Sequence, residues 1–133
     1  MDLLQALRPL HVPNDQQPPT TLADLAQRLQ QFADARDWGQ FHSPKNLASA
    51  LIVEAGELLE HFQWQTETQS RQLSPEQKQA VAHEMADVLL YLVQLSSSLE
   101  VDLMAAASEK MVINERKYPV DQARGSSKKS EAT

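Results

Sequence analysis

Two pairs of carboxylates are the side chains of this sequence most suited to chemistry. Glu54 and Glu57 form the first pair, and Glu84 and Asp87 form the second. In an α-helix, a spacing of three residues brings the second side chain to within about 60° of the first, so each pair projects from one side of its helix. Both pairs lie beside apolar residues rather than opposite them. We therefore expect four carboxylates to converge if the two helices that carry them pack together.

Four converging carboxylates would repel one another, so they would have to take up protons or bind cations. The chain has no cysteine, and all-oxygen ligands suit Mg²⁺ first and Mn²⁺ second. Mg²⁺ usually keeps several waters and is completed by the phosphates of a substrate. The pattern therefore favours a metal site for a phosphate ester, but the spacing does not name the reaction. The alternative of two solvated helix faces stays open, because acidic pairs of this kind are common on helices.

The acidic side chains are concentrated in one part of the chain. The net charge of the 133 residues is −6, and residues 51–100 hold eight acidic side chains against two basic ones. Both carboxylate pairs lie in this middle part. A net charge of −6 argues against sequence-independent binding to a phosphate backbone. No nucleic-acid polymer is therefore expected as a partner.

Four helical segments are expected to position these residues, over about 21–37, 45–62, 74–98 and 101–118. Ser43-Pro44 and Ser74-Pro75 are typical of helix starts, because serine caps free amides and proline suits the first turn. Pro119 ends the last segment. Short connections favour antiparallel neighbours, so the predicted fold is all-α, a four-helix bundle-like domain. Such a small core leaves apolar surface to be covered, which predicts an oligomer.

The composition divides the chain into three parts. Residues 1–19 are predicted to form an irregular N-terminal arm, residues 20–119 the helical domain, and residues 120–133 a flexible C-terminal tail. The first residues lack the basic and apolar regions of a signal peptide. No apolar run reaches the roughly 18–20 residues of a membrane span. A cytoplasmic protein that binds no membrane is therefore expected.

The acidic pairs are accompanied by four further motifs in a fixed order. These are residues 37–42 (DWGQFH), 62–64 (FQW), 87–91 (DVLLY) and 110–119 (KMVINERKYP). Together with E-x-x-E and E-x-x-D on successive helices, they resemble the MazG-like all-α nucleoside triphosphate pyrophosphohydrolases, and most closely their dCTP pyrophosphatase branch. The resemblance covers about residues 20–125 and implies that residues 20–119 form a MazG-like catalytic domain.

The resemblance implies an activity as well as a fold. Such an enzyme uses Mg²⁺ to cleave a nucleoside triphosphate between its α- and β-phosphates, and it releases a nucleoside monophosphate and pyrophosphate. By the same resemblance, the partners are a small-molecule nucleoside triphosphate and further copies of the chain in a homo-oligomer, commonly a homotetramer. The cellular role would be to clear modified or excess dNTPs from the nucleotide pool.

The acidic motifs match the metal ligands of this family. The four positions are Glu54, Glu57, Glu84 and Asp87. They would hold Mg²⁺ against the triphosphate, neutralise developing charge and lower the pKa of a bound water. Glu60 continues the first motif, and we expect it either to orient the attacking water or to face solvent. His61 and His83 are expected to point away from the site because of their helical phase.

Two sets of substrate contacts also follow from the resemblance. Aromatic and imidazole groups would surround the base and sugar: Trp38, Phe41, His42, Trp64 and Tyr91. Three side chains that recur at i, i+4 and i+7 on the last helix would contact the phosphates: Lys110, Asn114 and Lys117. The alternative for the two tryptophans is a place in the core. The alternative for Lys117 is a favourable interaction with the helix dipole.

One position departs from the dCTP pyrophosphatase pattern. Animal members carry a histidine in the first helix where this chain has Leu29. The contact of that histidine to the nucleotide would be lost, so dCTP, a modified dCTP or a broader set of dNTPs is expected. Two alternative functions stay open, namely the same fold acting on another nucleotide and a non-catalytic helical module that binds a partner.

Overall fold

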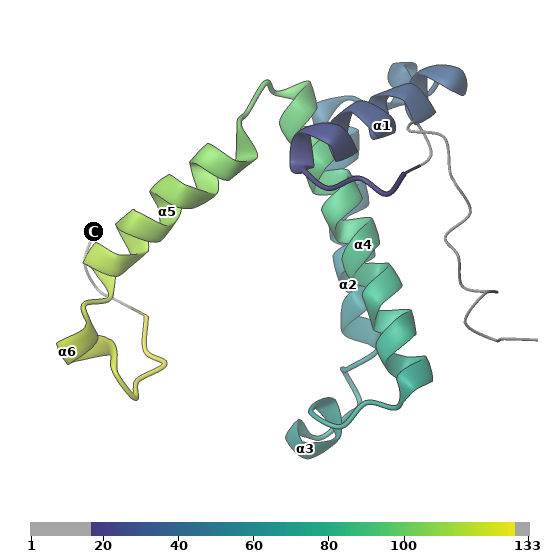
Figure 1. The fold of residues 1–133 in the computed structure, drawn as a ribbon. Coiled ribbons are helices and arrows are strands. Elements are labelled where there is room, and N and C mark those ends of the chain that lie inside the picture. The colour runs from purple at the N-terminus through teal and green to yellow at the C-terminus, as the bar shows by residue number, and fades with distance from the viewer. Residues whose placement is uncertain (1–16, 130–133) are drawn as a thin grey trace, which may run out of the picture.

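The computed structural model describes residues 17–129 (Figure 1). The first 16 residues of the predicted arm and the last four residues of the predicted tail lie outside the described residues. The elements in chain order are α1 Leu22–Ala35, the 3₁₀ turn η2 Gly39–Phe41, α2 Pro44–Glu60, α3 Glu67–Ser70, α4 Pro75–Ser98, α5 Leu103–Lys117 and α6 Val120–Ala123. No strand occurs in this range, so the predicted all-α class is confirmed. None of these helices is by itself long and apolar enough to cross a membrane.

Capping side chains explain where the long helices begin. The Thr21 Oγ1 atom accepts a hydrogen bond from the Asp24 amide at 3.1 Å. Ser43 caps α2 in the same way, and Ser74 caps α4 in a reciprocal capping box. Asp102 caps α5. The four predicted helices are thus confirmed, and their ends differ from the predicted ones by at most about two residues.

Three short elements have no counterpart in the predicted pattern. The turn η2 lies in the loop between α1 and α2, and α3 follows α2 with a capping box of its own. The third, α6, lies within the segment predicted as a flexible tail. Each is about one turn long, and hydrophobic periodicity cannot detect a helix of that length.

The antiparallel pair of α2 and α4 forms the centre of the fold, and α1 packs against α4 (Figure 1). A bend of 102° separates α4 from α5. It contains Glu100, whose φ of 54° is in the left-handed region. Beyond the bend, α5 points away from the other three long helices (Figure 1). The expected four-helix bundle therefore does not close within a single chain, because three helices pack and the fourth projects.

The core of the described chain is small. Four apolar side chains are buried: Ala33, Leu47, Val81 and Val93. Many large apolar side chains stay at the surface instead, and Met85 on α4 is 57% exposed. The face of α4 that meets α2 carries Glu84 in addition to apolar residues, and within residues 17–129 Met85 and Leu89 of α4 stay exposed.

Leu47 should be critical for stability because it is only 2% exposed in this small core. We expect Leu47→Ala to lower the free energy of unfolding by about 2–5 kcal/mol, through lost burial and the cavity left behind. Urea denaturation followed by circular dichroism measures this change. The control is Val120→Ala, since Val120 is 76% exposed and its truncation should cost less than about 0.5 kcal/mol. Equal denaturation midpoints for the two variants would contradict the assigned core.

Candidate active site

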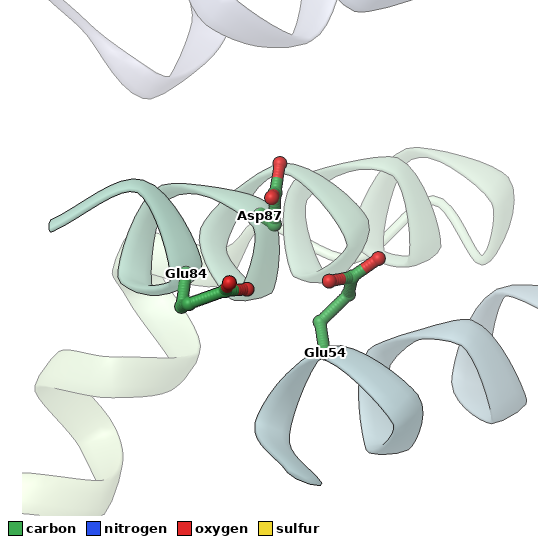
Figure 2. Close-up of side chains that lie close together, drawn as sticks. All are labelled: Glu54, Glu84 and Asp87. Carbon is green, nitrogen blue, oxygen red and sulfur yellow. The ribbon is translucent and has the colours of Figure 1, made fainter. Parts of the chain in front are cut away.

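Three carboxylates meet where α2 faces α4. Glu54 extends from α2 toward Glu84 and Asp87 on α4 (Figure 2). One oxygen atom of each carboxylate lies within 4.8 Å of the other two. The packing of the two helices therefore brings carboxylates from both acidic pairs close together. We call Glu54, Glu84 and Asp87 the acidic cluster.

Glu57, the fourth predicted ligand, lies beside the acidic cluster and is exposed. A hydrogen bond joins its side chain to that of Glu54. Partial burial is the largest cause that raises the pKa of Glu54, and the hydrogen bond to Glu57 is the next. The negative charges of the neighbouring carboxylates raise this pKa further. The cluster therefore favours a proton or a cation at its centre.

Glu84 carries a buried oxygen that has no partner among residues 17–129. Its Oε2 atom is buried and makes no hydrogen bond there. Its Oε1 atom lies 3.7 Å from the Nε2 atom of His61. Leaving a buried carboxylate oxygen unsatisfied is costly, and a hard divalent cation would satisfy it. The donor set, composed only of carboxylate oxygens, fits Mg²⁺ or Mn²⁺.

His61 lies at the site, so its expected orientation away from the site is wrong. It follows the last residue of α2 and keeps helical backbone angles, with φ −66° and ψ −21°. It is seven residues after Glu54, and this spacing places the two side chains on one side of the helix. The spacing from Glu54 is therefore the signal in the sequence that identifies His61 as a neighbour of Glu84.

A cavity of about 140 Å³ adjoins the acidic cluster, because Asp87 is part of its wall. Its lining comes from α1 (Leu29 and Phe32), from the loop after α1 (Trp38 and His42) and from α4 (Asp87, Leu90, Tyr91 and Gln94). Trp38 contacts Phe32 edge-on, with ring centroids 5.6 Å apart, and His42 at 6.2 Å. The cavity thus joins flat aromatic surface to a carboxylate of the cluster.

Three of the predicted base contacts and three unpredicted residues line this cavity. Trp38, His42 and Tyr91 belong to the first group. Phe32, Leu90 and Gln94 belong to the second. Leu90 and Gln94 lie three and seven residues after Asp87, so helical spacing from a predicted ligand is the signal that could find them.

The remaining predicted site residues lie elsewhere in the described chain. Phe41 is 59% exposed, Trp64 is 88% exposed, and neither lines the cavity. Glu60, the last residue of α2, is exposed and lies outside the acidic cluster. The predicted phosphate contacts are on α5: Lys110, Asn114 and Lys117. Since α5 points away from α2 and α4 (Figure 1), one chain does not bring these three residues to its own acidic cluster.

Comparison with known proteins places this architecture in a family. The model of the MazG-like family matches residues 50–132. The chain belongs to the MazG-like family. It is 46% identical over 114 residues to dCTP pyrophosphatase 1 of Homo sapiens, an alignment that covers 84% of the chain and 67% of the human protein. It is 44% identical over 111 residues to dCTP pyrophosphatase 1 of Mus musculus, with 82% of the chain and 65% of the mouse protein covered. The chain thus spans about two thirds of the length of these relatives.

A solved structure shares this MazG-like fold. A pyrophosphatase from Archaeoglobus fulgidus superimposes with a TM-score of 0.71 and is 38% identical in sequence. The match covers 77% of this chain and 96% of the archaeal one. The predicted resemblance to the MazG-like family is therefore confirmed.

The raised pKa of Glu54 makes a prediction about stability without metal. The folded protein keeps a proton on Glu54 at a pH where the unfolded chain has lost it, so stability falls as the pH rises through the raised pKa. We expect metal-free Glu54→Gln to melt at a higher temperature than the wild type at about pH 7–8, and at a similar temperature near about pH 4.5. Mg²⁺ should raise the melting temperature of the wild type more than that of the variant.

Thermal unfolding in a chelator and then in Mg²⁺ measures these differences. The matched control is Glu109→Gln, since Glu109 is an exposed residue of α5. It should follow the wild type in both conditions. If metal-free Glu54→Gln melts at a lower temperature than the wild type at neutral pH, repulsion within the acidic cluster does not destabilise the folded protein.

Proposed function

We propose that this chain is a Mg²⁺-dependent pyrophosphohydrolase of deoxynucleoside triphosphates, with dCTP or a modified dCTP among its substrates. The observation that carries the proposal is that Asp87 belongs both to the acidic cluster and to the wall of the aromatic cavity. A nucleotide whose base enters the cavity would hold its phosphates at the cluster. The 46% identity to dCTP pyrophosphatase 1 supports this reaction. Its role would be to remove modified or excess dNTPs from the nucleotide pool.

The three carboxylates of the acidic cluster and the neighbouring Glu57 would hold the metal. Bound Mg²⁺, or Mn²⁺ in its place, would neutralise phosphate charge and lower the pKa of water. In the hydrolysis, the oxygen of water bonds to one of the two phosphorus atoms, α or β, and the bond from that phosphorus to the bridging oxygen breaks. The products are a dNMP and pyrophosphate. Glu60 lies three residues after Glu57, near the same side of α2, and is the candidate for orienting this water. His61 would hold one oxygen of Glu84 while the other binds the metal.

The aromatic residues of the cavity would bind the base and sugar. Trp38 offers a flat surface for stacking, and its contact with Phe32 restricts its orientation. Tyr91 lies four residues after Asp87 on α4 and lines the same cavity, where its hydroxyl would hydrogen-bond near the metal or the sugar. His42 lines the same cavity from the loop after α1.

Exposed apolar residues support the assembly of several copies. On α2, Ile52, Val53 and Leu59 are 67%, 59% and 60% exposed. On α4, Met85 and Leu89 are 57% and 41% exposed and lie one turn apart. Soluble monomers rarely expose extended apolar surface of this kind. A homo-oligomer, which would be a tetramer by family resemblance, would bury these residues between copies.

A second copy would also complete the site. The three predicted phosphate contacts on α5 lie away from the acidic cluster of their own chain (Figure 1). If α5 of one copy covers the cluster of another, Lys110 and Lys117 bring positive charge to the phosphates and Asn114 adds an amide donor. The exposed indole of Trp64 would be buried by the same assembly. We therefore propose that each active site is formed by more than one chain.

The reaction is tested by incubating the full chain with each dNTP and Mg²⁺ and identifying the products by chromatography. We expect dNMP and pyrophosphate, and no product when the metal is chelated. Asp87→Ala should lower kcat by about 100-fold or more, because it removes a metal ligand.

A matched control keeps this test specific. Glu109→Ala removes an exposed carboxylate of α5 and should leave the turnover number unchanged. The appearance of dNDP and orthophosphate, or the absence of turnover with every dNTP, would reject the proposed reaction. Unchanged turnover in a folded Asp87→Ala protein would reject the assigned metal site.

Shared sites are tested by complementation between two impaired variants. Asp87→Ala and Lys110→Ala should each be weakly active alone. When the two chains are coexpressed, a hybrid site can contain the intact Asp87 of one chain and the intact Lys110 of the other, so activity should return. Light scattering should give a mass of several chains. A monomeric wild type, or coexpressed variants without regained activity, would contradict the shared site.

A further inference from the structure

A second cavity adjoins the cavity that Trp38 and Tyr91 line. Its volume is about 200 Å³, and it is lined by the loop and helix residues around Ala33, Leu47 and Ser98. Three residues belong to the walls of both cavities, namely Leu29, His42 and Gln94. Gln94 therefore lies at the boundary between the two cavities, with space on both sides.

Gln94 is placed at the end of the first cavity that is far from the metal ligands. It is seven residues after Asp87 on α4, which puts both on one side of the helix and about 10 Å apart along its axis. Tyr91 lies between them and lines the same cavity. A nucleotide with its phosphates at the acidic cluster and its base in the cavity would direct the base toward Gln94.

The amide of Gln94 is available for a ligand. The residue is half-buried, and no hydrogen bond in residues 17–129 uses its side chain, in contrast to Ser96 and Ser97 on the same helix, whose hydroxyls donate to the Val93 carbonyl. The side chain of Leu29, which lines both cavities from α1, offers only carbon atoms. An amide carries both an acceptor and two donors, and no described contact determines which of them faces the cavity.

We propose that the Gln94 side chain hydrogen-bonds to the pyrimidine base, and that it binds cytosine, uracil and thymine about equally well. This inference rests on the proposed function. Cytosine presents a donor at N4 beside an acceptor at N3, whereas uracil and thymine present an acceptor at O4 beside a donor at N3. The Gln94 amide can pair with either pattern after a half-turn of its terminal group. The wild-type site therefore does not distinguish the two kinds of pyrimidine.

The test compares kcat/KM for dCTP, dUTP and dTTP in the wild type, Gln94→Glu and Gln94→Leu. The wild-type values should lie within about tenfold of one another. An ionised glutamate only accepts hydrogen bonds, so it would keep one bond, from N4 of cytosine or from N3 of uracil and thymine, and oppose the acceptor beside it. Gln94→Glu should therefore lower kcat/KM for all three nucleotides by about tenfold or more. Gln94→Leu should raise KM for all three with little change in kcat, because the metal ligands are untouched.

Two controls separate a failed inference from a failed proposed function. Gln79→Glu adds the same charge at an exposed glutamine of α4 and should leave the three kcat/KM values unchanged. Binding of dCMP and dUMP by calorimetry needs no turnover, and both should bind more weakly to Gln94→Leu. A wild type that prefers dCTP by more than about 100-fold, or a folded Gln94→Glu protein with the wild-type kcat/KM values, would overturn the proposal. Absence of pyrophosphate with every dNTP would reject the proposed function, and the binding data would then decide the role of Gln94.

Discussion

The contact between two acidic helix faces is the constraint on which the rest of this structure depends. Glu54 on α2 faces Glu84 and Asp87 on α4, so the helices pack although their carboxylates repel one another. The buried side chains of Leu47 and Val81 lie on the same two helices and favour the contact. A cation at this position would remove the repulsion, so metal binding and the stability of the helix pair would be coupled.

Local signals in the sequence were sufficient to predict the long helices and the acidic pairs. Ser43 and Ser74 mark the starts of α2 and α4 because a cap satisfies amides within the same turn. The i, i+3 spacing of Glu84 and Asp87 likewise depends on one helix alone. None of these features requires knowledge of how distant segments meet.

Features that depend on tertiary contacts could not be predicted in the same way. The direction of α5 follows from the bend at Glu100, and no periodic pattern encodes a bend. Both tryptophans were predicted to contact the base because they are aromatic. Only Trp38 lines the cavity, whereas Trp64 is 88% exposed. His61 and Gln94 each lie seven residues after a predicted ligand, but only the facing helices show that this side of the helix meets a site.

The continuity of α4 has a consequence for how this family can tolerate insertions and deletions. Asp87, Tyr91 and Gln94 line one cavity only because an unbroken helix keeps them on one side. One inserted residue between Asp87 and Tyr91 would turn every later side chain by about 100° and remove it from the cavity. The segment between α2 and α4 bears no such constraint beyond His61, since length changes there leave both helical registers intact. Natural length variation should therefore be absent from the middle of α4 and concentrated around α3.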